Sequence, residues 1–247
     1  MAKIKERIAM EETGNYLHLS GTLTDTPEYG HEVFGEKFYY ATLSVPRLSG
    51  AEDLLPITIS ERLMEGITLD IGSPLCFEGQ LRSYNKVVEG SGRLLITGFA
   101  QRLLDPDTEE NPNQVHLTGA LCKPPSYRTT PFGREIADLM LAVNRAYGKS
   151  DYIPCITWGR TARFASHLKV GDKVTLLGRF QSRAYQKQLA DGTVLNKTAY
   201  EVSVGRLSMA DTIVQPATPY VMRPGAREDV SIHFDTTHDG VIYGNPQ

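Results

Sequence analysis

Residues 15–30 read NYLHLSGTLTDTPEYG, and residues 113–128 repeat this pattern as NQVHLTGALCKPPSYR. The two stretches share His, Gly, Leu, Pro and Tyr at a constant spacing of 98 residues, beginning with His18 and His116. An internal repeat with a long period indicates that one structural unit occurs twice in the chain.

The repeat extends well beyond these two stretches. Arg47 and Asp53 match Arg145 and Asp151 at the same spacing. At a spacing that is longer by one residue, IGSPLCFEGQLRS at 71–83 matches VGDKVTLLGRFQS at 170–182. Two copies of a domain of about a hundred residues therefore explain the chain better than one large fold.

Composition marks the boundaries between the copies. The segment LDPDTEENPN is acidic and rich in Pro and Asn, which is typical of a linker. We expect an N-terminal segment at 1–14, a first domain at 15–104, a linker at 105–112, a second domain at 113–208 and a tail at 209–247. In the tail, the alternation of Val230, Ile232 and Phe234 predicts a strand.

The second copy shows the hydrophobic period of strands in five runs. These are VHLTGAL at 115–121, IADLMLAVN at 136–144, DYIPCITW at 151–158, VTLLGRFQSRAY at 174–185 and TAYEVSVGRL at 198–207. Asp191-Gly192 predicts a hairpin turn between the last two runs.

Between the third and fourth runs the period changes to that of a helix. Ala162, Phe164, Ala165 and Leu168 are predicted to cluster on one side of a short helix that ends before Gly171. Three strands, a helix and two strands follow the order of an OB-fold, a small barrel that binds oligonucleotides or oligosaccharides. We therefore predict an all-β fold with short helices, made of two tandem five-stranded OB-fold barrels.

Charge divides the chain in the same way. The whole chain carries a net charge of −3, but residues 1–112 hold 10 Lys and Arg against 18 Asp and Glu. Residues 113–208 hold 14 basic against 6 acidic residues, which is a net charge of +8. This asymmetry indicates that the second domain meets a polyanion and the first does not.

Several classes of protein are disfavoured. No run of eighteen apolar residues is present and MAKIKERIAMEE lacks the apolar segment of a signal peptide, so we expect a cytoplasmic protein without a membrane partner. Cys76, Cys122 and Cys155 are too far apart for a CxxC pair, which predicts buried free thiols. No catalytic or cofactor motif occurs, so we expect no enzyme and no cofactor. His18 and His116 are interpreted as strand-pairing or interface residues.

Strand geometry places possible ligand-binding side chains on common faces. In residues 151–158, Tyr152 and Trp158 fall on the same face. In the fourth strand, Arg179, Gln181, Arg183 and Tyr185 share a face that is too polar for a core. Aromatic rings beside guanidinium groups suit single-stranded nucleic acid, which offers base faces and phosphates. The alternative for Trp158 is a place in the barrel core.

These blocks give the second copy a resemblance to the bacterial single-stranded DNA-binding protein (SSB) family. The blocks are NQVHLTGAL, LAVNR, DYIPCITWGRTA, LKVGDKV, LLGRFQSRAY and YEVSV, in this order over about residues 113–208. The resemblance implies four base-stacking positions, which fall on Tyr147, Tyr152, Trp158 and Tyr185. In the first copy these positions hold Ser49, Leu54, Ser60 and Tyr84, so only Tyr84 remains aromatic.

The sequence thus predicts a protein that coats single-stranded DNA with little sequence preference, in replication, recombination or repair. The residues expected to contact phosphates are Arg145, Lys149, Arg160, Arg179, Arg183 and Lys187. A tandem arrangement also resembles family members in which two chains supply four domains, which implies a homodimer. The tail lacks the acidic tip that family members use to recruit enzymes. The alternative is an OB-fold adaptor of a replication or primosome-like assembly whose binding of nucleic acid is incidental.

Overall fold

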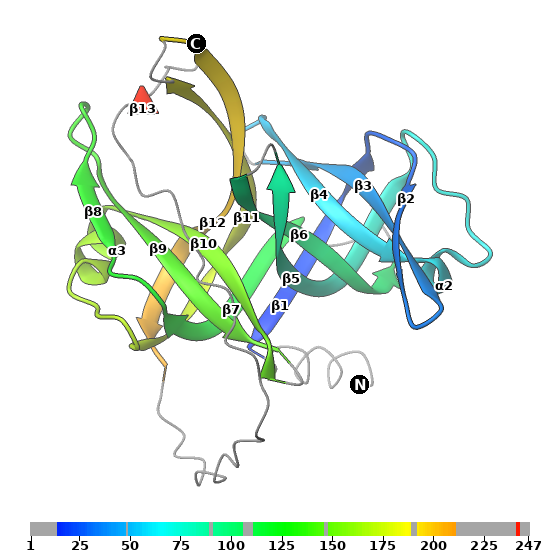
Figure 1. The fold of residues 1–247 in the computed structure, drawn as a ribbon, viewed down its shortest axis with the longest axis horizontal. Helices are drawn as coiled ribbons and strands as arrows, with labels where there is room; N and C mark the ends of the chain where they lie inside the picture. Colours follow the sequence, from blue (N-terminus) through cyan, green and yellow to red (C-terminus); the bar gives the residue numbers. More distant parts are fainter. Residues whose placement is uncertain are drawn as a thin grey trace, which may run out of the picture.

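Residues 14–47, 49–88, 91–105, 111–145, 148–188, 192–210 and 241–242 are described by the structure, a computed structural model. Figure 1 shows two barrels side by side, joined near their first strands. The predicted turn at Asp191 and the predicted strand at Val230 to Phe234 lie outside the described residues.

The first barrel is built from the N-terminal half of the chain. Its elements are β1 (Asn15–Leu23), β2 (Glu28–Val33), β3 (Glu36–Pro46), β4 (Glu52–Ser60), α2 (Glu61–Met64), β5 (Pro74–Val88) and β6 (Ser91–Leu104). β1 pairs with both β3 and β5, and β4 closes the barrel by pairing in parallel with β6. β2 lies outside the barrel as a hairpin partner of β3.

The second barrel repeats this arrangement. Its elements are β7 (Asn113–Leu121), β8 (Ser126–Thr129), β9 (Glu135–Asn144), β10 (Ser150–Trp158), α3 (Gly159–Ala165), β11 (Lys173–Gln188) and β12 (Val194–Met209). β7 pairs with β9 and β11, and β10 closes the barrel against β12. The prediction of two five-stranded OB-fold barrels is confirmed. A short strand, β13 (Val241–Ile242), pairs with the far end of β11.

Each barrel is filled by apolar side chains that alternate along its strands. Phe77 in the first barrel and Phe180 in the second are fully buried. Burial of a side chain of this size contributes about 2 to 3 kcal/mol to the free energy of folding. None of the helices in the described part of the chain is long and apolar enough to cross a membrane.

The close approach of neighbouring strands explains why both repeats have glycine at one position of the first strand, Gly21 and Gly119. A Cβ on Gly21 would lie 2.2 Å from the carbonyl oxygen of Ser44, and one on Gly119 would lie 2.5 Å from that of Ala142. These contacts are too short for any side chain, so glycine is required where β1 meets β3 and where β7 meets β9.

One prediction for the helix is wrong. Ala162, Ala165 and Leu168 are buried, but Phe164 is 41% exposed. Each helical residue turns the chain by about 100°, so Phe164 points almost opposite to Ala162. With fewer than two turns in α3, only one narrow face meets the barrel.

The two barrels join through their first strands. β1 and β7 pair antiparallel, with Leu17 opposite Val115 at the centre. Asn15 faces Leu117 and Leu19 faces Asn113, so the pairing has an approximate two-fold symmetry. His18 and His116 both lie in this strand pair, as their interpretation as strand-pairing residues requires.

Candidate nucleic-acid interface

β10 presents aromatic side chains on the outer surface of the second barrel. Ile153 and Cys155 face the core and are buried, whereas Tyr152 is half-buried and Trp158 is 40% exposed. The alternative that Trp158 fills the barrel core is therefore excluded. Gly159 follows with a φ of 54°, a conformation that glycine adopts without strain and that ends the strand directly after the indole.

The other predicted stacking residues are distributed as follows. Tyr185 is half-buried near the far end of β11, where its backbone lies opposite Lys197. Tyr147 lies outside the described residues. In the first barrel Tyr84 is 41% exposed on β5, and burial, followed by the nearby Tyr40, raises the pKa of its hydroxyl. The assignment of Tyr84 to the position of Tyr185 is wrong, because Ser83 and Ser182 make matching contacts in the two barrels and Tyr84 therefore corresponds to Arg183.

The six cations predicted to contact phosphate divide into two groups. Lys149 and Arg160 are exposed, and neither forms an ion pair with any residue in the described ranges. Lys187 lies on β11 with its backbone opposite Leu195. The remaining three, Arg145, Arg179 and Arg183, all contact carboxylates.

Arg145 lies at the boundary between the barrels. Its Nε donates to Asp151 Oδ2 over 2.5 Å, and its Nη2 donates to the carbonyl oxygen of Ser83 in the first barrel over 3.1 Å. The Ser83 N–H in turn donates to Asp151 Oδ1 over 2.5 Å, and the Tyr152 N–H donates to Ser83 Oγ over 2.8 Å. The backbone of Tyr152 is thus held by the opposite barrel.

The first barrel makes the same contacts in reverse. Arg47 donates to Asp53 Oδ2 over 2.7 Å and to the carbonyl oxygen of Ser182 over 3.0 Å. The Ser182 N–H donates to Asp53 Oδ1 over 2.8 Å, and the Leu54 N–H donates to Ser182 Oγ over 3.2 Å. We call the two sets together the reciprocal Arg-Asp-Ser contacts.

Each buried aspartate also meets a second guanidinium from the opposite barrel. Arg82 Nη1 lies 3.2 Å from Asp151 Oδ2, and Arg179 Nη1 lies 3.3 Å from Asp53 Oδ2. Burial lowers the pKa of Arg82, and the neighbouring Arg145 lowers it further. Burial and then Arg47 lower the pKa of Arg179 in the same way. Two cations at each carboxylate offset the cost of burying its charge.

Other charged groups of the second barrel are also paired. Arg183 Nε donates to Glu201 Oε1 over 2.9 Å, and Gln181 donates to the same oxygen over 3.0 Å. On α3, Arg163 Nε donates to Glu135 Oε2 over 2.6 Å. The net charge of this barrel therefore overstates the positive charge that is not paired among the described residues, to which Arg160 and Lys149 contribute.

Sequence reasoning did not identify a group of aromatic side chains on the first barrel. His31 stacks on Phe38 at 5.1 Å between ring centroids, and Phe38 lies 5.7 Å from Phe99. The Arg82 guanidinium carbon lies 5.7 Å from the centroid of Phe99. The alternation of EKFYYATL at 36–43 carries a weak signal, but Phe99 joins the group only through the pairing of β4 with β6.

The side chains that the structure describes form neither a metal site nor a disulfide. No cluster of three His, Cys, Asp or Glu residues suited to a metal ion occurs there. The three cysteines are free; Cys76 and Cys155 are buried, and Cys122 is partly buried.

Comparison with known proteins gives matches in both sequence and structure. Residues 112–210 match the model of the "Single-strand binding protein family". "Single-stranded DNA-binding protein A" of Bacillus subtilis (strain 168) is 41% identical over 83 residues, which cover 31% of this chain and 48% of that protein. "Single-stranded DNA-binding protein B" of the same organism is 37% identical over 83 residues, covering 31% of this chain and 74% of that protein. The chain spans about half the length of most curated relatives it matches.

Among solved structures, the tandem arrangement itself is found. The wild-type single-stranded DNA binding protein from Thermus aquaticus is 25% identical, with a TM-score of 0.58 over 86% of this chain and 98% of that chain. A deletion mutant of the same protein gives a TM-score of 0.61 over 82% of this chain and 97% of that chain. The similarity therefore extends over both barrels.

Proposed function

Because the chain belongs to the single-strand binding protein family, we propose that it coats single-stranded DNA with little preference for sequence. The observation that carries this proposal is the exposure of Trp158 on the outer face of β10, on the same side of the strand as Tyr152. An indole that fills no core, two residues before an arginine that forms no ion pair with the described residues, Arg160, suits a base and its phosphate.

We assign the bases to the four aromatic positions of the second domain, Tyr147, Tyr152, Trp158 and Tyr185. Phosphates are assigned first to Lys149, Arg160 and Lys187. The sequence expectation also included Arg145, Arg179 and Arg183, but each of these meets a carboxylate in the structure. In our proposal these three hold the stacking strands in place, and their charge toward DNA is largely compensated.

The biological role follows from the chemistry of coating. A protein that holds bases without reading their edges protects single strands in replication, recombination and repair, and needs neither a cofactor nor a catalytic group. We propose that it works in the cytoplasm, on the nucleoid. We further propose a homodimer, because two chains with two barrels each would supply four OB-folds along one strand.

The test uses the unique tryptophan of the chain. Oligo-dT is titrated while the emission of Trp158 is followed, and salt is then added to the complex. We expect stoichiometric quenching that salt reverses, because phosphate contacts weaken steeply as ionic strength rises. Unchanged emission at saturating DNA, with binding verified by mobility shift, would contradict the stacking role of Trp158. Binding that is insensitive to salt would favour the adaptor alternative.

A further inference from the structure

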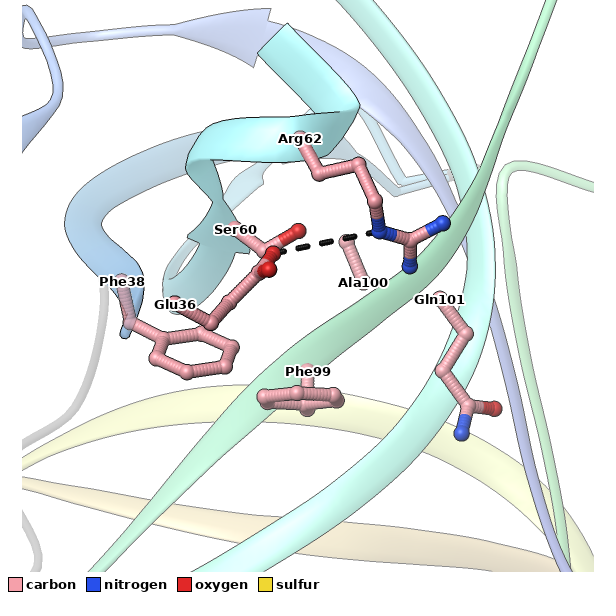
Figure 2. A pocket seen from close by; sticks show the side chains of 7 residues that line it. All are labelled: Glu36, Phe38, Ser60, Arg62, Phe99, Ala100 and Gln101. Carbon is pink, nitrogen blue, oxygen red and sulfur yellow. Dashed lines mark ion pairs between the residues drawn. The ribbon is translucent and has the colours of Figure 1, made fainter. Parts of the chain in front are cut away.

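A pocket of about 390 Å³ opens on the first barrel. Its lining residues are Glu36, Phe38, Ser60, Arg62, Phe99, Ala100 and Gln101. Figure 2 shows the rings of Phe38 and Phe99 on one side, with the Arg62 guanidinium across from them. Pockets of this size accept small organic groups, and two aromatic walls favour a flat one.

The pocket lies where the second barrel has its tryptophan. Ser60 ends β4 as Trp158 ends β10, and each precedes the short helix of its barrel. Phe38 is the direct strand partner of Ser60, whereas the corresponding partner of Trp158 is Ile136. The first barrel therefore has the small Ser60 at the position of Trp158, and the ring of Phe38 lies on the neighbouring strand β3.

On the other side of β4, strand β6 also has an aromatic residue where the second barrel has a small one. Phe99 of β6 pairs with Thr58 of β4, and the corresponding partner of Ile156 in β10 is Ser203. The aromatic surface has thus moved from the third barrel strand, where Trp158 carries it, to the two strands that flank Ser60.

Polar groups in the pocket are available to a ligand. Ser60 is 4% exposed, and its Oγ has no hydrogen-bond partner among the residues that the structure describes. Arg62 is only loosely paired, with Nε 3.9 Å from Glu36 Oε1, and its side chain is 70% exposed. A buried hydroxyl without a partner is costly, so a ligand that hydrogen-bonds to Ser60 gains that energy on binding.

We propose that this pocket holds a base of the same single strand that the second barrel binds, with the base against Phe38 and Phe99 and a phosphate near Arg62. The inference rests on the proposed function of the second barrel. It means that the first barrel contacts nucleic acid through rings at different positions from those of the second.

The pocket of the first barrel lies close to β10 of the second barrel, and this favours nucleic acid over another occupant. The guanidinium of Arg82 lies beside Phe99 and also contacts Asp151, the residue next to Tyr152. One cationic side chain therefore links the aromatic pocket of the first barrel to the stacking strand of the second. A DNA strand that leaves Tyr152 therefore reaches Phe99 next, and the ring of Phe99 offers a surface for a base.

The test compares two lengths of oligo-dT on the full chain. One of roughly 8 nucleotides suits a single OB-fold, and one of roughly 30 nucleotides can reach both. For Phe99→Leu, which keeps an apolar side chain but removes the ring, we expect affinity for the long oligonucleotide to fall by about fivefold or more, corresponding to the loss of one stacked base. Affinity for the short one, followed by the emission of Trp158, stays at the wild-type level.

Phe38→Leu should behave like Phe99→Leu, and Phe34→Leu is the matched control because Phe34 is fully exposed in the same barrel outside the pocket. Wild-type affinity of both pocket variants for the long oligonucleotide overturns the inference, and so does an equal loss at both lengths, which reports a disturbed fold. Neither result affects the proposed function, which is tested separately on wild-type protein by the quenching of Trp158 and its reversal by salt.

Discussion

Asp53 and Asp151 occupy equivalent places at the boundary of the two barrels, and each accepts a hydrogen bond from a backbone N–H of the opposite barrel. Both carboxylates are fully buried and each meets two guanidinium groups. The reciprocal Arg-Asp-Ser contacts thus fix the third strand of each barrel against the fourth strand of the other. The position of Tyr152 depends on this boundary.

We expect Asp151→Ala to lower the free energy of unfolding by about 3 kcal/mol, because it leaves Arg145 and Arg82 without their buried partner. The lower end of the usual range applies, since both guanidinium groups are partly exposed. Urea unfolding of the variant and wild type measures the difference. Glu61→Ala is the control, because its pair with Lys37 is exposed on both sides and should contribute little to stability. Equal effects of the two substitutions would refute the structural role of Asp151.

The two groups of cations should separate in the salt dependence of binding. Arg160→Ala and Lys149→Ala each remove a charge that forms no ion pair with the described part of the chain, so each should reduce the slope of log affinity against log salt by about 0.7. Arg183→Ala should change this slope less, because Glu201 already balances the charge of Arg183. Fluorescence anisotropy of labelled oligo-dT at several salt concentrations gives the slopes. A larger change for Arg183→Ala than for Arg160→Ala would reverse our assignment.

Tyr84 and Tyr185, which lie on the fourth strands of the first and the second barrel, test which barrel dominates. Tyr185→Ala should weaken binding of a short oligo-dT by about 1 to 3 kcal/mol, the usual contribution of one stacked base. Tyr84→Ala should weaken it less, because Tyr84 lies on the first barrel, where Ser49, Leu54 and Ser60 replace the aromatic residues of the second barrel. Titrations of both variants under one salt condition are compared. The opposite order would show that the first barrel binds short strands.

The fold was predictable from the sequence because the repeat and the strand period are local signals. The alternation in DYIPCITW placed Tyr152 and Trp158 on one face, but only the structure shows that Trp158 is exposed there. The partners of Arg145 and Arg179 were not predictable, because Ser83 and Asp53 come from the other barrel and only the paired structure brings them near.

The aromatic pocket escaped prediction for a related reason. Comparing the two copies position by position finds Ser60 where Trp158 stands and indicates a lost aromatic surface. Phe38 and Phe99 reach the same place from neighbouring strands, so their contribution depends on strand register. Phe164 was misplaced because a helix of under two turns gives too few residues to fix the phase of its buried face.

The thiols should react in an order set by burial. Burial raises the pKa of Cys155, with a further contribution from Glu201, and burial also raises that of the less buried Cys122. We expect a thiol reagent to modify Cys122 first in the native protein and Cys155 only on unfolding. Reaction kinetics with and without urea measure this, and Cys122→Ser should remove the early phase. Rapid modification of a second thiol in the native Cys122→Ser variant would contradict the burial of Cys76 or Cys155.

The raised pKa of Cys155 makes the stability of the protein depend on pH. A thiol whose pKa is raised in the folded state keeps its proton there, while the unfolded chain loses it above about pH 8.5. The stability contributed by neutral Cys155 is therefore complete below that pH and declines as the pH rises further. Urea unfolding of wild type and Cys155→Ala at neutral and alkaline pH measures this, and the variant should show the smaller decline. An equal decline in both proteins would rule out a contribution from Cys155.

Trp158 and Phe164 offer the most direct comparison, because they are 40% and 41% exposed and lie six residues apart. Trp158→Ala should weaken binding of oligo-dT by about 1 to 3 kcal/mol, since it removes the ring on which a base stacks. Phe164→Ala should change affinity little, because Phe164 projects from α3 and not from the outer face of β10. Anisotropy of a labelled oligonucleotide measures both variants without relying on tryptophan emission. Equal losses would mean that exposed aromatic area alone, and not the position on β10, determines binding.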